Sequence, residues 1–98
     1  MKVFVLVKQF MYGTQDYGIF RTRAQADIEL AKCGPEGAPS IVEAPVFGEE
    51  VLDDTVYSAA CYDPATDIHV LEGVYSSYEA AKVAAGERGL VTSRELDQ

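Results

Sequence analysis

The chain has 98 residues, a length that fits one compact domain with a modest hydrophobic core. Its sixteen acidic and eight basic residues give a net charge of -8 at pH 7. This balance argues against direct binding to nucleic acid or to an anionic membrane, because both need Lys and Arg. The first apolar run, Val3–Val7, is too short for a signal peptide or a membrane span. We therefore expect a cytoplasmic protein whose charged partner, if it has one, is basic.

The first half is predicted to fold as two strands, a helix and a third strand. Val3–Val7 is apolar at every position, which is typical of a central strand covered on both faces. Thr22 and Gln25 fit a capping box and predict the start of a helix. Pro45 cannot donate to a strand ladder, so its strand should lie at an edge or a bulge. The predicted elements are strand Val3–Val7, turn 11–16, strand Tyr17–Phe20, helix Arg23–Cys33 and strand Ser40–Phe47.

The second half is predicted to follow the same order. Ser76 and Glu79 form a second capping box, and Gly86 or Gly89 should end the helix that it opens. The predicted elements are strand Thr55–Tyr62, turn Asp63–Asp67, strand Ile68–Tyr75, a helix from about residue 77 and strand Leu90–Leu96. The residues expected to point inward are Ala24, Ile28 and Ala31 in the first helix, and Ala80, Val83 and Ala84 in the second.

The two halves also correspond residue by residue. Val3-Phe4 matches Val56-Tyr57, and the matches continue with Gly18, Phe20, Thr22 and Ala26 against Gly73, Tyr75, Ser77 and Ala81. The sequence therefore predicts an α+β fold made by tandem ββαβ duplication, with a pseudo-two-fold axis and two helices on mainly antiparallel sheet. The halves, 1–48 and 55–98, belong to a single domain and are joined by an acidic linker, 49–54. Whether the strands form one sheet or two stays open.

The chain offers few residues suited to catalysis or metal binding. The one histidine, His69, falls in a predicted strand on a face with Leu71 and Tyr75. No Lys or Arg lies near Cys61 in sequence to lower its pKa, so we expect a core residue. The acidic residues lack EF-hand spacing. We predict no catalytic residue, cofactor or metal site; a ligand or catalytic cleft between the halves near His69 and Tyr75 is the competing hypothesis.

Negative charge is concentrated in the middle of the chain. Between Lys32 and Lys82 there is no Lys or Arg, and the carboxylates of this span are Glu36, Glu43, Glu49, Glu50, Asp53, Asp54, Asp63, Asp67, Glu72 and Glu79. Such a span either keeps a small protein soluble or steers it onto a basic partner. Tyrosines add large contact area, although Tyr57 and Tyr75 are expected in the core. The residues predicted to bind a partner are Glu49, Glu50, Asp53, Asp54, Asp63, Asp67 and Tyr62.

Two stretches carry a resemblance to known proteins. Val3-Phe4-Val5-Leu6, together with the run Gly73-Val74-Tyr75-Ser76-Ser77-Tyr78-Glu79-Ala80-Ala81, resembles small uncharacterised bacterial and phage proteins. Those proteins open with a Val-Tyr-Val-Leu strand and carry a Gly-Val-Phe/Tyr-Ser-Ser-x-Glu-x-Ala junction. The first half departs from the junction pattern, with Arg21-Thr22 in place of Ser-Ser. The resemblance implies a ββα fold type and says nothing about catalysis.

These observations lead to two functional hypotheses. The first is a non-enzymatic acidic protein that binds and inhibits a basic, nucleic-acid-binding partner, as a phage-type inhibitor of host defence or a nucleic-acid mimic does. The alternative is a structural module with no catalytic activity. It would form a homodimer through a strand edge or through the small-residue faces of its helices.

Overall fold

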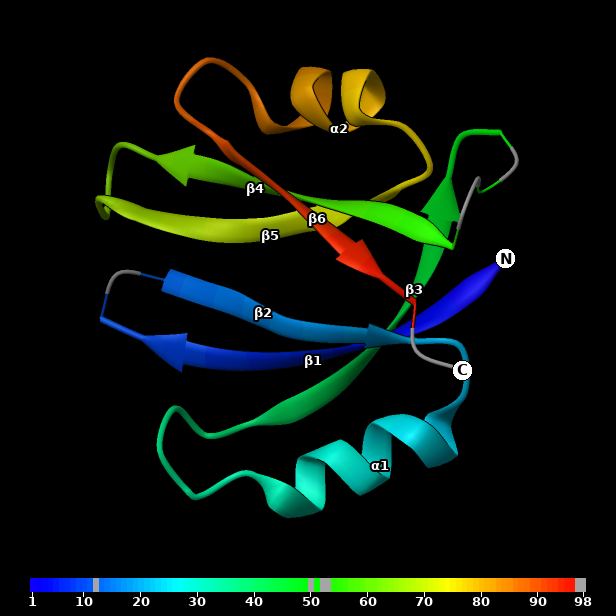
Figure 1. The fold of residues 1–98 in the computed structure, drawn as a ribbon. Helices are drawn as coiled ribbons and strands as arrows, with labels where there is room; N and C mark the ends of the chain where they lie inside the picture. Colours follow the sequence, from blue (N-terminus) through cyan, green and yellow to red (C-terminus); the bar gives the residue numbers. More distant parts are fainter. Residues whose placement is uncertain (12, 50, 52–53, 97–98) are drawn as a thin grey trace.

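The computed structural model describes residues 1–11, 13–49, 51 and 54–96. Within these residues the fold is α+β, with six strands and two helices, as expected (Figure 1). The elements are β1 (Lys2–Phe10), β2 (Gly13–Phe20), α1 (Arg23–Lys32), β3 (Ser40–Phe47), β4 (Thr55–Asp63), β5 (Ile68–Tyr75), α2 (Tyr78–Ala85) and β6 (Leu90–Glu95). Neither helix has the length or the apolar run needed to span a membrane.

Hydrogen bonding joins the six described strands into one mixed sheet, in the order β2-β1-β3-β5-β4-β6. The pairs within each half are antiparallel, whereas β3 and β5 are parallel and meet only at Val46–Val74 and Phe47–Tyr75. A second parallel contact joins β2 to β5 at Gly13 and His69. Beyond Val46 and Phe47, the residue pairs recorded for β3 are all with β1. Pro45 therefore sits where β3 has an unpaired edge, as its missing N–H requires.

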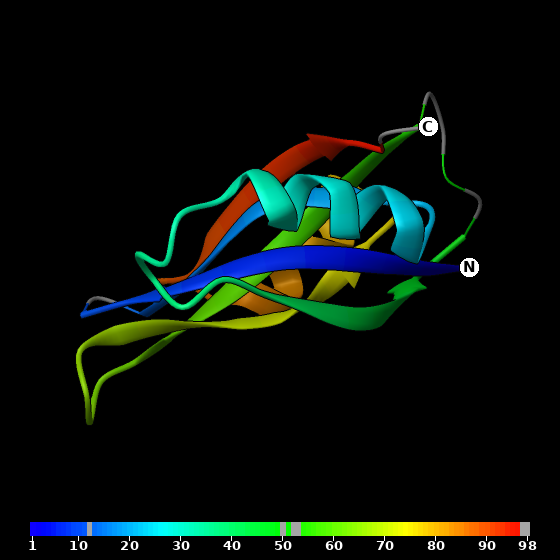
Figure 2. The same cartoon turned by 90° about the horizontal axis from the view of Figure 1, so that it is seen from below.

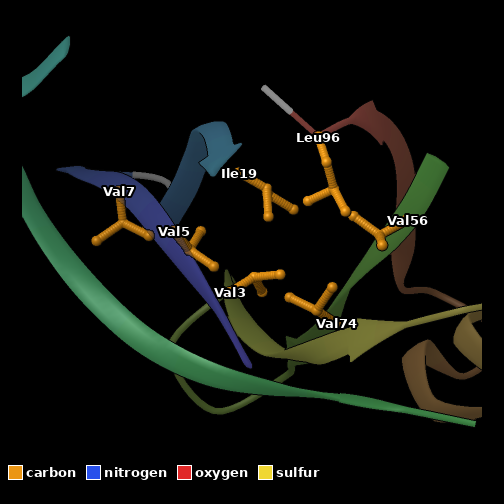
Figure 3. Close-up of a cluster of buried hydrophobic side chains, with 7 residues drawn as sticks. All are labelled: Val3, Val5, Val7, Ile19, Val56, Val74 and Leu96. Carbon is orange, nitrogen blue, oxygen red and sulfur yellow. The ribbon is translucent and has the colours of Figure 1, made fainter. Parts of the chain in front are cut away.

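The main core lies between the two halves. The side chains of Val3, Val5, Val7 and Ile19, from β1 and β2, point toward those of Val56, Val74 and Leu96 (Figure 3). The intervening residues of β1, Phe4 and Leu6, pack instead under α1. The prediction that Val3–Val7 is a central strand covered on both faces is confirmed. The order of layers in Figure 1 is α1, then β1 and β2, then β4 and β5, then α2.

Each helix packs on the outer face of the sheet through residues that differ in part from those predicted. Helix α1 lies across the first half (Figure 2) and buries Ala26, with Leu30 and Cys33 packed beside it. Ile28 is 51% exposed. Helix α2 buries Ala81 and Ala85, and Val83 is 83% exposed. The prediction that side chains point inward is therefore wrong for Ala24, Ile28, Ala31 and Val83. Apolar residues occur on more than one side of each helix, so the sequence pattern did not determine which side faces the sheet.

A bulge in each hairpin changes which residues share a face. In the first hairpin the register shifts between Leu6 and Val7, which leaves Tyr17 without a partner on β1. In the second it shifts between Ala59 and Ala60, which leaves Glu72 without a partner on β4. An extra residue reverses the alternation of side chains beyond it. Leu71 consequently packs on the central core and Tyr75 on the α2 side. The prediction that His69, Leu71 and Tyr75 share one face is thus wrong for Tyr75.

Both helices begin at a hydroxyl cap. Thr22 caps α1 as predicted, accepting a hydrogen bond from the Gln25 N–H at 3.2 Å. The cap of α2 is Ser77, which accepts from the Ala80 N–H at 3.2 Å, and not the predicted Ser76. The N–H of Ser76 donates instead to the Phe47 carbonyl at 2.9 Å, which ties β5 to β3. Ser76 therefore precedes the cap and bonds to β3 through its backbone.

This assignment predicts different costs for the two serines. Ser77→Ala should lower the free energy of unfolding by about 1 kcal/mol, because an orphan N–H of α2 loses its acceptor. Ser76→Ala keeps the backbone bond to Phe47 and should cost clearly less. Urea denaturation of both variants checks this. A larger decrease in the free energy of unfolding for Ser76→Ala would indicate that Ser76 is the cap.

Candidate functional site

The residues predicted to bind a partner separate into two groups at opposite ends of β4. Glu49 and Asp54 precede this nine-residue strand, whereas Tyr62, Asp63 and Asp67 lie at its far end and in the following turn. At about 3.3 Å per residue the strand holds the groups about 25 Å apart. Glu50 and Asp53 lie outside the described residues. Figure 1 shows the two ends on opposite sides of the molecule.

At the linker end, Asp54 is held within the molecule. Its carboxylate forms an ion pair with Arg21, and its carbonyl accepts a hydrogen bond from the Leu96 N–H at 2.7 Å. It thus links the start of β4 to the first half and to the end of β6. Glu49 is exposed and forms no ion pair among the described residues. Of these two carboxylates, Glu49 is the one available to a partner.

At the hairpin end, Asp63 organises the turn between β4 and β5. Its carboxylate accepts hydrogen bonds from the Ala65 N–H at 3.0 Å and the Thr66 hydroxyl at 2.9 Å. Its carbonyl accepts from the Asp67 N–H at 2.8 Å. Side chains of Asp commonly fix turns in this way. Asp63 therefore has a structural role that sequence alone did not assign.

Tyr62, Asp67 and Arg88 form one stack beside that turn. The Tyr62 hydroxyl donates to the Asp67 carboxylate, and this bond is the first cause of a raised Tyr62 pKa. Arg88 lies over the Tyr62 ring, with its Cζ 3.9 Å from the centroid. The ring face is thus covered by a cation of the same chain. The structure brings Tyr62 and Asp67 together, but Arg88 occupies the place over the ring that a cation of a basic partner would take.

His69 lines a small cavity between the halves. Its Nε2 lies 3.1 Å from the Arg88 carbonyl, and its ring lies 5.4 Å from that of Tyr62. The cavity, of about 90 Å³, is lined by Thr14, Gln15, Asp16, Ser58, Ala60, His69, Leu90 and Thr92. Tyr75 is not among them, so the structure does not place it with His69. Within the described part of the chain, no group of three or more His, Cys, Asp or Glu could hold a metal ion.

Four aromatic residues form a surface that the sequence did not single out. We call Phe47, Tyr57, Tyr75 and Tyr78 the aromatic strip. Phe47 and Tyr75 lie 5.5 Å apart between ring centroids, and Tyr57 and Tyr78 meet edge to face at 6.1 Å. Tyr57 and Tyr75 are cross-strand partners, so the two pairs are continuous. Figure 1 shows the ends of β3 and β5 side by side, where the chain enters α2.

Both ends of the aromatic strip are open to solvent. Phe47 is 48% exposed and Tyr78 is 50% exposed, whereas Tyr57 and Tyr75 are partly buried against the core under α2. Tyr57 and Tyr75, which were expected in the core, thus lie at its edge, packed against it but only partly buried. Gly73 forms part of the floor, since a Cβ there would lie 3.4 Å from both the Phe47 and the Tyr75 ring. The strip thus has a partly buried centre and exposed ends.

Glu72 adds negative charge beside the strip. Burial, Glu72 and Cys61 together raise the pKa of Tyr75, with burial the largest cause. The Cys61 thiol lies 3.9 Å from the Glu72 carboxylate and donates to the Ala84 carbonyl at 3.1 Å. Burial and then the Glu72 charge raise the pKa of this thiol. The raised pKa disfavours the reactive thiolate. Cys61 is only partly buried and is not one of the buried core residues, so the prediction that it lies in the core is wrong.

The raised thiol pKa predicts slow alkylation. In a Cys33→Ser background, Cys61 should react with iodoacetamide at about pH 8.5 more slowly than the same chain in urea, because the thiolate is the reactive form. Glu72→Gln should speed the reaction by about threefold, since it removes one cause of the raised pKa. Glu79→Gln makes the same charge change without contacting the thiol and should have little effect; equal acceleration by both variants would contradict the assignment.

Comparison with known proteins gives no family to build on. No family model, no curated protein and no solved structure matches the chain. The interpretation of this surface therefore depends on its own chemistry.

Proposed function

We propose that this chain is a non-enzymatic acidic protein of the cytoplasm that binds a basic surface of a nucleic-acid-binding protein and blocks it. The observation that carries the proposal is how the molecule uses its positive charges. All eight bases belong to the described residues, and five form ion pairs: Lys2, Arg21, Arg23, Lys32 and Arg94. Lys8 and Arg88 lie over tyrosine rings. Lys82 is the base that has neither kind of partner among the described residues.

The negative charges, in contrast, are left in surplus. Eight described carboxylates form no ion pair there: Glu36, Glu49, Asp63, Asp67, Glu72, Glu79, Glu87 and Glu95. All except Asp63 are exposed residues. Uncompensated exposed charge of one sign speeds encounter with a partner of the opposite sign and repels nucleic acid. A basic protein surface is the partner that this balance favours.

Binding to immobilised protein tests the proposal. Purified basic nucleic-acid-binding proteins and a polylysine peptide are passed over it at about 50 mM and about 300 mM salt, which shortens the screening length roughly twofold. We expect retention at low salt that falls steeply at high salt, and competition by DNA for the same proteins. No retention of any basic probe at low salt would mean that the surplus charge only keeps the protein soluble.

We also propose that the chain is a tandem ββαβ duplication with a pseudo-two-fold axis. Three features recur at corresponding places: a cross-strand aromatic pair, a bulge, and a hydroxyl cap. The aromatic pairs are Phe4–Phe20 in the first half and Tyr57–Tyr75 in the second. The strand orders β2-β1-β3 and β5-β4-β6 are also the same. These shared details support a common origin of the halves better than element order alone does.

Self-association is the alternative proposal. Its support is the position of β6 at the end of the sheet, because an end strand leaves backbone groups open to another chain. The small-residue face of α2 does not favour it, since Ala81 and Ala85 already pack on their own sheet. Light scattering over a dilution series tests this alternative. A monomer at every concentration would remove it and leave the proposed inhibitor unaffected.

A further inference from the structure

We infer that the aromatic strip, with Glu72 and Glu79 at its margin, is the docking surface for Lys or Arg side chains of the basic partner. The inference rests on the proposed function and adds the place and the chemistry of contact. Aromatic rings attract cations over their faces, and tyrosine is enriched where protein surfaces bind. The strip joins four such rings in one continuous surface.

Outside the strip, the two described tyrosines, Tyr17 and Tyr62, are each covered by a cation. The Lys8 Nζ lies 4.5 Å from the centroid of the Tyr17 ring, and the Arg88 Cζ lies 3.9 Å from that of Tyr62. Each ring is thus paired with a cation of the same chain. None of the eight bases, all of which are described, lies over a ring of the aromatic strip. Among the described residues, the strip therefore lacks the kind of group that covers Tyr17 and Tyr62.

Two carboxylates without an ion pair favour a cation at this place. Glu72 acts electrostatically on Tyr75, and Glu79 follows Tyr78 in the first turn of α2. Both are exposed, and neither is in an ion pair among the described residues. Glu49 lies two residues after Phe47 and adds a third exposed carboxylate. Rings and carboxylates together select a cation over an apolar or an anionic ligand.

The first half supplies a contrast. There the cross-strand aromatic pair is Phe4–Phe20, which packs beneath α1, with Phe20 only 6% exposed. The second half has tyrosines in this pair, and Phe47 and Tyr78 extend it to the surface. Hydroxyl groups let an aromatic ring lie between core and water. The second-half pair also packs under α2, but the adjoining Phe47 and Tyr78 carry its aromatic surface out to solvent.

Leucine substitutions separate cation binding from simple apolar contact. Phe47→Leu and Tyr78→Leu keep apolar bulk and remove the ring faces. We expect the double variant to bind a fluorescein-labelled, eight-residue polylysine peptide about tenfold more weakly than wild type, by fluorescence anisotropy at low salt. Tyr17→Leu is the matched control, because that exposed ring is already covered by Lys8, and it should bind as wild type does.

Charge variants test the margin of the strip. Glu72→Gln with Glu79→Gln should weaken peptide binding about tenfold. Glu36→Gln with Glu87→Gln changes net charge equally, away from the strip, and should weaken it at most about twofold. Unchanged urea midpoints establish that all variants are folded. If wild type binds but strip and control variants are alike, the inference is overturned and the proposed function stands. If wild type does not bind the peptide, the proposed function itself fails.

Discussion

Replacing Arg94 by methionine is expected to lower the free energy of unfolding by about 3 kcal/mol, because it leaves a buried carboxylate without its partner. Asp16 is 8% exposed, and its carboxylate accepts a hydrogen bond from the Arg94 Nε at 2.7 Å. A second guanidinium nitrogen donates to the Asp16 carbonyl at 2.6 Å. The pair joins β2 to β6 and so connects the two halves. We take the lower end of the usual range because the Arg94 side chain is 32% exposed.

Urea denaturation of four variants measures this effect: Arg94→Met, Asp16→Asn, the two combined, and Lys2→Met. Lys2→Met breaks an ion pair between Lys2 and Glu43, in which the two side chains are 74% and 50% exposed. This substitution should cost at most about 1 kcal/mol. Asp16→Asn combined with Arg94→Met should cost less than the sum of the single changes, since both act on one interaction. A loss for Arg94→Met no larger than that for Lys2→Met would show that the pair does not hold the halves together.

Gly13→Ala is expected to lower the free energy of unfolding by about 3 kcal/mol or more, through overpacking and backbone strain together. Gly13 has a φ of 128°, a backbone conformation that residues with a side chain rarely adopt. An added Cβ would lie 2.1 Å from the His69 carbonyl oxygen and 2.8 Å from its nitrogen. Both are backbone atoms of β5, so the clash can be relieved only by separating β2 from β5.

Gly86→Ala provides the control for this substitution. Gly86 also has a positive φ, of 80°, but a Cβ there would meet nothing within 4 Å. It should therefore cost about 2 kcal/mol, from backbone strain alone, because its φ of 80° and ψ of -178° lie in a region that few residues except glycine adopt. If Gly13→Ala costs no more than Gly86→Ala, the contact with His69 is not the reason that glycine is needed at Gly13.

Strand and helix boundaries were predictable where a local pattern marks them. The turn predicted over 11–16 is wrong, because β1 continues to Phe10 and β2 begins at Gly13. The predicted ranges Ser40–Phe47 and Ile68–Tyr75 are those of β3 and β5, and the α1 cap at Thr22 is confirmed. The α2 cap was missed because Ser76 and Ser77 both satisfy local rules. The correspondence between halves had already matched Thr22 with Ser77. What decides the position is the bond from Ser76 to Phe47, a contact between distant residues that no local pattern contains.

Features that depend on how the halves meet were not predictable. The parallel contacts of β5 with β2 and β3 make the sheet mixed, although each half alone is antiparallel. The bulge opposite Glu72 turns Tyr75 away from the face of Leu71. The sequence pattern of β5 does not indicate an extra residue at Glu72, because Gly73 is compatible with a regular strand and with a bulge.

The candidate site shows the same division. Sequence identified the charge surplus correctly as a property of composition, but it grouped residues that β4 holds far apart, such as Asp54 and Asp67. It could not show that Asp54 pairs with Arg21 or that Arg88 covers Tyr62. The aromatic strip has a usable signal in retrospect, since Tyr57 and Tyr75 replace Phe4 and Phe20 of the first half. The contribution of Phe47 requires the contact between β3 and β5.

An NMR titration of the isotope-labelled protein with the polylysine peptide tests the central claim most directly. The account predicts that the largest shifts fall on Phe47, Gly73, Tyr75 and Tyr78, and that the signals of Tyr17 and Tyr62 move little, because their rings are already covered by Lys8 and Arg88. Shifts centred on the turn from Asp63 to Asp67, or the absence of any shift at low salt, would contradict it.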